Sequence, residues 1–121
     1  MCNILFLMKE KILLEKYLLY TRNLKYKSYG ILLEDLDLDN YIEKLNSLDI
    51  LVVEIEKLDL NIKKIIQKIK KRFRNCKILI LVPEMNTEIE NFIIEFSIDA
   101  YLTFPILPFQ LLRSLYCLNE F

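Results

Sequence analysis

Apolar runs alternate with amphipathic stretches from one end of the chain to the other. Five short segments are rich in apolar residues, and a nearly continuous apolar run such as 3–8 is typical of a strand that is buried on both faces of a sheet. The five segments cover residues 3–8, 27–33, 49–55, 77–82 and 100–103. We therefore predict five strands, of which 49–55 has the clearest pattern.

The segments between these runs have the spacing of amphipathic helices. Residues 61–74 place five apolar side chains on one helical face and lysine or arginine on the other. These apolar residues are Ile62, Ile65, Ile66, Ile69 and Phe73. Similar patterns predict helices over 10–22, 39–45 and 108–118, and one more whose buried face comprises Ile89, Phe92, Ile93 and Phe96.

Three of these helices carry residues suited to their first turn. Asp39 can accept hydrogen bonds from the free amides at the start of 39–45. Thr87 and Glu90 have the spacing of a capping box, in which each side chain bonds to the backbone N–H of the other. Pro108 suits a helix start because the N–H that it lacks would have no partner there.

The alternation of strands and helices makes five βα units. Crossovers of this length hold a helix, run right-handed and cover a face of the sheet. The 121 residues are a common size for one domain, and no linker, repeat or low-complexity tract interrupts them. We therefore predict one doubly wound α/β domain over residues 1–121, with a parallel five-stranded sheet.

Composition excludes several classes of function. The 17 lysine and arginine residues balance 17 aspartate and glutamate residues, so the total charge favours neither nucleic acid nor a membrane as partner. The absence of histidine removes histidine-based catalysis and most zinc sites. No run reaches the roughly 18 apolar residues of a membrane span, and Lys9 and Glu10 break any secretory pattern. The three cysteines are odd in number and lack a CxxC pair, so we expect reduced thiols in a cytoplasmic protein.

The charges are unevenly distributed along the chain. A basic helical face could contact nucleic acid or an acidic partner, but it has no interleaved aromatic residues, and a solvated face is the simpler interpretation. It comprises Lys63, Lys64, Lys68, Lys70, Lys71, Arg72 and Arg74. The acids Glu34, Asp35, Asp37 and Asp39 lack the glycine and the terminal glutamate of a calcium loop. We interpret them as a solvated loop.

Two local motifs in this order of elements resemble the receiver domains of bacterial two-component response regulators. The segment 49–55 is similar to the third strand of that family, whose last acid is the phosphorylated aspartate. The segment 99–105 is similar to the fifth-strand motif, which normally ends in Lys-Pro. The resemblance covers nearly the whole chain. It implies the flavodoxin-like strand order 2-1-3-4-5, with a site at the carboxyl ends of the strands.

The resemblance also implies that the phosphorylation pocket is dismantled. Met8 and Lys9 stand at the acidic pair that holds Mg²⁺, and Glu54 stands at the phosphoacceptor. Val82 replaces the hydroxyl residue, Phe104 replaces the lysine, and Pro105 alone is retained. Phosphoryl transfer needs metal and cationic groups to neutralise the phosphoryl oxygens, so we expect no enzymatic activity and no bound Mg²⁺ or other cofactor.

Glu54 admits three interpretations. It is a partial mimic of the phosphorylated state, a remnant of a site no longer used, or the partner of Lys9 in an ion pair that replaces the metal.

Two further positions follow from the resemblance. Tyr101 is either the switch aromatic of the family or an ordinary core tyrosine, and the peptide bond between Phe104 and Pro105 is expected to be cis.

These residues predict a module that acts by protein contact, independently of phosphorylation, in signalling or transcription regulation. In the family, the fourth helix, fifth strand and fifth helix form the usual surface for docking or two-fold dimerisation. Here those elements include Glu88, Glu90, Asn91, Glu95, Tyr101, Arg113 and Tyr116. We expect a homodimer through this surface and no direct contact with nucleic acid, although an attached output domain could bind DNA.

Other functions stay open from the sequence. They are a phosphoacceptor that uses Glu54 in an unusual way, a stand-alone adaptor that docks on another protein, and a flavodoxin-like cofactor binder. The last is disfavoured because the segment after the first strand is not the Gly/Ser/Thr-rich loop that a flavin phosphate requires.

Overall fold

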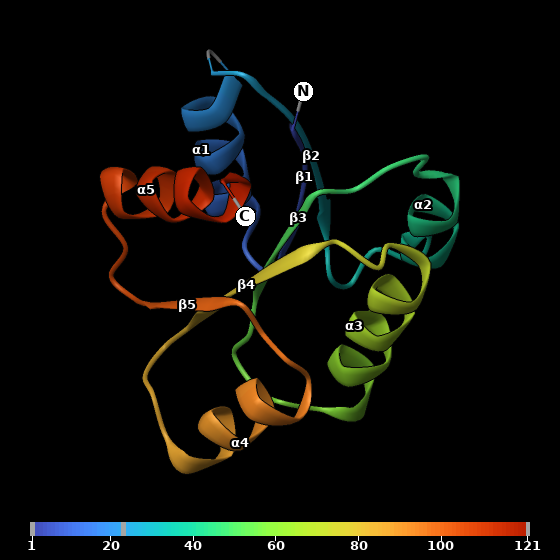
Figure 1. Ribbon diagram of the computed structural model, residues 1–121, viewed down its shortest axis with the longest axis vertical. Coiled ribbons are helices and arrows are strands. Elements are labelled where there is room, and N and C mark those ends of the chain that lie inside the picture. Colours follow the sequence, from blue (N-terminus) through green and yellow to red (C-terminus); the bar gives the residue numbers. More distant parts are fainter. Residues whose placement is uncertain (1, 23, 121) are drawn as a thin grey trace.

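The computed structural model describes residues 2–22 and 24–120, and within these ranges it contains five strands and five helices (Figure 1). The strands are β1 (Cys2–Met8), β2 (Tyr26–Leu32), β3 (Ile50–Glu54), β4 (Lys77–Val82) and β5 (Ala100–Thr103). The helices are α1 (Lys11–Arg22), α2 (Leu38–Lys44), α3 (Leu60–Arg72), α4 (Thr87–Glu95) and α5 (Pro108–Asn119).

The strands form one parallel sheet in the order β2-β1-β3-β4-β5. Both the fold class and the strand order predicted from the sequence are confirmed. Because β1 lies between β2 and β3, the chain winds in one direction along the sheet and then in the other. Because all strands are parallel, their carboxyl ends lie at one edge of the sheet. The winding reverses between β1 and β3, and ligands of such sheets bind at this point.

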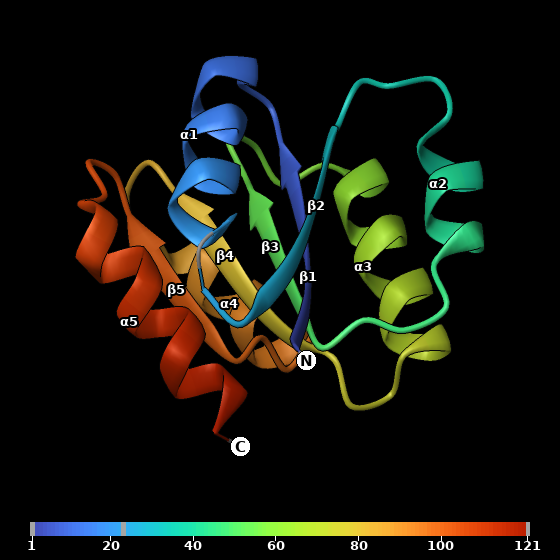
Figure 2. The same cartoon turned by 90° about the horizontal axis from the view of Figure 1, so that it is seen from above.

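Helices cover both faces of the sheet, as Figure 2 shows from above. The helices α1 and α5 pack on one face, and α2, α3 and α4 pack on the other. In β3, Leu51 and Val53 point into the layer of α2, α3 and α4, whereas Ile50 and Val52 point into the layer of α1 and α5. This alternation explains the continuous apolar runs, since a strand covered on both faces has no polar side.

Gly30 allows α1 to lie close against β2. A Cβ atom at this position would lie 2.5 Å from Cδ1 of Leu14 and 3.1 Å from Cδ1 of Leu18. Both leucines belong to α1, so a larger residue at position 30 would require the side chain of Leu14 to move. The single glycine of the chain is therefore explained by packing.

The predicted bounds are confirmed for β4 and β5 and are wrong by one or two residues elsewhere. Glu10 precedes α1, Asp49 and Ile55 flank β3, and α3 ends at Arg72. The longest helix, α3, has 13 residues, and none of the described helices is long and apolar enough to cross a membrane.

Two predicted helix caps are wrong. Asp39 lies inside the first turn of α2, which begins at Leu38. Thr87 is the first residue of α4, and Asn86 is its N-cap, with Oδ1 accepting a hydrogen bond of 2.8 Å from the N–H of Ile89. An amide oxygen at the N-cap satisfies a first-turn donor as well as the hydroxyl would. Pro108 begins α5 as predicted.

Candidate functional site

The candidate site lies where β1, β3, β4 and β5 end. Parallel register places the ends of neighbouring strands side by side, with Val82 of β4 beside Thr103 of β5. The turns that follow these strands line a shallow pocket of about 430 Å³. Lys9, Glu54 and Phe104, three of the six residues singled out from the sequence, line it together.

The other three residues of that set have different environments. Met8 and Val82 are fully buried and point into opposite layers, Met8 towards α1 and α5 and Val82 towards α2, α3 and α4. Pro105 is exposed, and its peptide bond with Phe104 is cis, which confirms the prediction for this bond. The thioether of Met8 therefore lies in the core, below the pocket.

Glu54 ties the end of β3 to the turn between β1 and α1. Its Oε1 atom accepts a hydrogen bond of 2.9 Å from the backbone N–H of Lys9 and one of 3.3 Å from that of Glu10. Hydrogen bonds from amides to a carboxylate are stronger than those between neutral groups. The half-buried carboxylate is thus held by two backbone donors.

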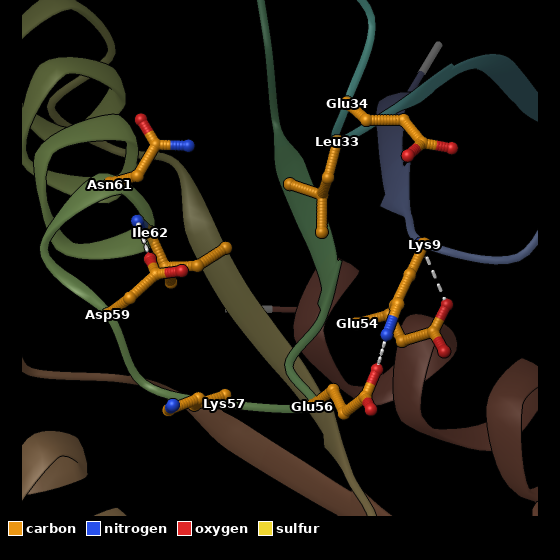
Figure 3. A pocket seen from close by; sticks show the side chains of 9 residues that line it. All are labelled: Lys9, Leu33, Glu34, Glu54, Glu56, Lys57, Asp59, Asn61 and Ile62. Carbon is orange, nitrogen blue, oxygen red and sulfur yellow. Dashed lines mark hydrogen bonds and ion pairs between the residues drawn. The ribbon is translucent and has the colours of Figure 1, made fainter.

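Of the three interpretations of Glu54, the ion pair with Lys9 is wrong. The ammonium group of Lys9 pairs instead with the carboxylate of Glu56, two residues further along the chain (Figure 3). The side chains of Lys9 and Glu56 are 56% and 59% exposed, so solvent screens the pair and it stabilises the fold by less than about 1 kcal/mol. Backbone amides, which the sequence pattern does not reveal, satisfy Glu54 in place of the lysine.

A second pocket of about 390 Å³ adjoins the first and extends towards α3 (Figure 3). Leu33 and Ile62 give it an apolar side, and most of its other lining residues are charged. The charged residues are Lys9, Glu34, Glu54, Glu56, Lys57 and Asp59. Asp59 caps α3, with Oδ1 accepting a hydrogen bond of 2.8 Å from the N–H of Ile62. Among residues 2–22 and 24–120, no three acidic or cysteine side chains are placed to hold a metal ion.

Tyr17 of α1 is a polar group near the site that the sequence pattern shows only as part of an apolar stripe. Its side chain is 2% exposed, and its hydroxyl group has no hydrogen-bond partner among the described residues. Burial raises the pKa of Tyr17 to about 12, and the negative charge of Glu54 adds to the rise. The phenol therefore lies close enough to Glu54 to sense its charge.

Known structures with this arrangement share its fold at low sequence identity. A putative pilus assembly protein from Burkholderia thailandensis aligns with a TM-score of 0.83 and 16% identity, over 100% of both chains. A CheY-like response regulator receiver domain from Methanospirillum hungatei aligns with a TM-score of 0.82 and 18% identity, over 99% of this chain and 95% of that one. The fold is that of receiver domains. No family model and no curated protein matches the sequence.

A third structure with the receiver fold is a DNA-binding response regulator of the LuxR family from Staphylococcus aureus. It aligns with a TM-score of 0.79 and 16% identity, over 98% of this chain and 99% of that chain. At identities below one fifth, these likenesses establish the fold, and the function has to be argued from the site.

The residues of α4, β5 and α5 that the sequence predicts at a docking or dimer interface are all exposed. They are Glu88, Glu90, Asn91, Glu95, Tyr101, Arg113 and Tyr116. Tyr101 is 49% exposed, which excludes an ordinary core position. Tyr116 is 62% exposed on α5.

The basic face of α3 is only partly solvated. Arg72 donates hydrogen bonds to the carbonyl groups of Ile42 and Leu45, and Lys68 pairs with Asp39 at 3.6 Å and with Glu43 at 3.2 Å. Lys70 donates to carbonyl groups just after α4. These three cations connect α3 to its neighbours, so part of the charge run has a structural role.

Proposed function

We propose that this chain is a receiver-like domain that acts through protein contact and does not accept a phosphoryl group. The observation that carries the proposal is the engagement of Glu54. At the position where receiver domains carry their phosphoacceptor, its Oε1 atom accepts hydrogen bonds from the backbone of Lys9 and Glu10. The carboxylate serves as an anchor for the turn after β1, and this use competes with nucleophilic attack.

The donor set at this edge does not fit Mg²⁺. Hard divalent cations require several oxygen ligands, usually carboxylates. The resemblance places that acidic pair at Met8 and Lys9, but the first is a buried thioether and the second is a cation paired with Glu56. Of the three positions at which receiver domains carry metal-binding acids, here Met8, Lys9 and Glu54, only Glu54 has a carboxylate.

Phe104 removes the cation that would neutralise a phosphoryl group. Its half-buried ring packs against the layer of α1 and α5 and lines the pocket beside Glu54. Phosphoryl transfer relies almost entirely on positioning and on the stabilisation of charge. A pocket with an aromatic ring in place of the lysine supports contact better than chemistry.

The partner in this proposal is another protein in the cytoplasm, and no cofactor takes part. The solved neighbours serve different processes, since one is a putative pilus assembly protein and another is a DNA-binding response regulator. The fold alone therefore does not select an output. The exposed residues of α4, β5 and α5 form one candidate surface, and a homodimer through it stays a prediction.

Intact mass spectrometry tests the loss of phosphorylation. The protein is incubated with Mg²⁺ and acetyl phosphate, alongside the variant Glu54→Gln, which keeps an acceptor for the two N–H groups but is a much poorer nucleophile. We expect no phosphoryl adduct on either protein. A stoichiometric adduct on the wild type that is missing from the variant would establish the alternative function, a phosphoacceptor that uses Glu54.

A further inference from the structure

Two large apolar side chains of α1 point away from the sheet. Ile12 is 68% exposed and Leu19 is 54% exposed. They are seven residues apart, which is close to two helical turns, so they lie on the same side of α1. The buried residues of the same helix, Leu14, Tyr17 and Thr21, occupy the opposite side. An amphipathic surface helix normally presents polar residues where Ile12 and Leu19 lie.

The neighbouring helix α5 repeats this pattern. Phe109 and Tyr116 are also seven residues apart, and they are 61% and 62% exposed. The buried residues of α5, Leu111 and Leu115, face the sheet. Both helices cover the same face of the sheet and lie side by side in Figures 1 and 2. Their exposed apolar residues therefore belong to one outer layer.

We propose that this layer, which we call the α1–α5 face, binds the same face of a second copy of the chain. Apolar side chains at i and i+7 on one exposed side of a helix are anchor positions from which it can pack against a partner. Two copies related by a two-fold axis would bring together four such helices, and the same patch would meet itself. The proposal is independent of the state of Glu54 and goes beyond the lack of phosphorylation.

The charges favour self-association through this face over self-association through α4. The exposed residues of α1 and α5 carry both signs, including Glu15, Lys16 and Arg113. In contrast, α4 contains three glutamates and no lysine or arginine. A two-fold contact centred on α4 would place these glutamates opposite one another, and like charges at an interface are unfavourable.

The size of the patch is appropriate for a modest dimer. Four large side chains that are each more than half exposed present on the order of 400–500 Å² of apolar surface, which is the size at which patches on a monomer commonly mark binding sites. A stable interface buries about 800 Å² per partner. The aliphatic stems of the flanking lysines and arginines supply part of the difference.

Sedimentation velocity over a wide concentration range tests the proposal with matched variants. Ile12→Lys and Leu19→Lys change the α1–α5 face on α1, which is not part of the surface formed by α4, β5 and α5. Ile94→Lys and Tyr101→Lys place the same charge at exposed residues of α4 and β5, of which Ile94 is 78% exposed. Because all four side chains are more than 45% exposed, we expect each variant to keep the thermal midpoint of the wild type.

We expect a dimer of the wild type whose dissociation constant rises at least about tenfold in the α1–α5 variants and stays unchanged in the other two. A wild-type protein that is monomeric at the highest concentration would overturn the proposal. So would a dimer that only the α4 and β5 variants weaken, or one that all four variants weaken equally. Acetyl phosphate is omitted, so the result does not depend on the phosphorylation test.

Discussion

At the scale of single residues, Tyr17 combines deep burial with a hydroxyl group that has no hydrogen-bond partner among the described residues. Leaving a buried hydroxyl unpaired costs about 1–3 kcal/mol. Its neighbours Phe6 and Tyr20 pack against the ring, with centroids 6.0 and 6.1 Å away. The ring therefore stabilises the layer of α1 and α5, while the hydroxyl group weakens it.

The variant Tyr17→Phe is expected to raise the free energy of unfolding by about 1 kcal/mol, because it keeps the ring and removes the unpaired group. It is also expected to change the pH dependence. The folded pKa of Tyr17 is raised from 10.0 to about 12, so its contribution is fully present below pH 10 and is lost as the pH rises towards 12. Urea denaturation between pH 8 and pH 12 measures both effects.

The buried thiol of Cys76, whose pKa burial raises from 9.0 to about 12, contributes in the same direction and overlapping range. Cys76 is present in both proteins, so its contribution does not distinguish them. Because only the wild type also has the Tyr17 hydroxyl group, it should lose stability more steeply than Tyr17→Phe across this range. Equal slopes for the two proteins would contradict the assignment to Tyr17.

Residue-level contacts at the site were the least predictable from the sequence. The position of Glu54 at the end of a strand followed from the strand pattern, and its proximity to Lys9 followed from the strand order that the resemblance to receiver domains implies. The partner of each side chain did not follow, because Glu56 offers the flexible lysine another carboxylate and the turn after β1 offers Glu54 two backbone donors. Backbone donors of a turn leave no mark in the pattern of side chains.

At the scale of elements, the end of α4 shows how a helix can stop without glycine. Ser97 has a φ of 52°, in the left-handed region that favours glycine. The N–H of Ile98 donates to the carbonyl of Ile93 at 3.0 Å, and the N–H of Ser97 donates to that of Ile94 at 3.4 Å. These two bonds form a Schellman motif, in which glycine is the usual residue at the left-handed position.

The variant Ser97→Gly is expected to raise the free energy of unfolding by about 0.5 kcal/mol. Relief of the left-handed strain, about 1 kcal/mol, is partly offset by the greater freedom of glycine in the unfolded chain. Ser114→Gly, inside α5, serves as the control and should lower the free energy of unfolding by up to about 1 kcal/mol. Urea midpoints measure both, and destabilisation by Ser97→Gly would contradict the strain argument.

The elements were predictable where burial decides them and less so at their ends. Strands β1, β3 and β4 are covered on both faces, so a continuous apolar run marks each of them, whereas the edge strands β2 and β5 are partly exposed and have a weaker pattern. Helix starts are harder, because Asn86 and Thr87 are adjacent residues of which either can cap a helix. The conformation of the preceding loop decides which of the two caps the helix, and the local sequence pattern does not reveal that conformation.

At the scale of the whole molecule, the two helical layers share one sheet. Strands β1, β3 and β4 each send alternate side chains into both layers. Loss of either layer would expose half of the apolar side chains of these three strands to water. The two layers are therefore expected to unfold together.

We accordingly expect one cooperative transition in urea, with coincident curves from far-ultraviolet circular dichroism and from tyrosine fluorescence. The fluorescence reports both layers, since Tyr17 lies in one and Tyr41 packs against the other. A fluorescence transition clearly separated from the loss of helix would show that one layer melts alone.

The position of β1 inside the sheet, between β2 and β3, also affects how the chain is made. Residues Ile4 to Met8 are fully buried in the finished fold, between β2 and β3. The 45 residues that separate Lys9 from Glu54 must be synthesised before β3 can cover this strand, which takes about 2–9 s at about 5–20 residues per second. During that interval a nascent strand of high aggregation propensity has no native partner on one side, so binding by a ribosome-associated chaperone would shield it.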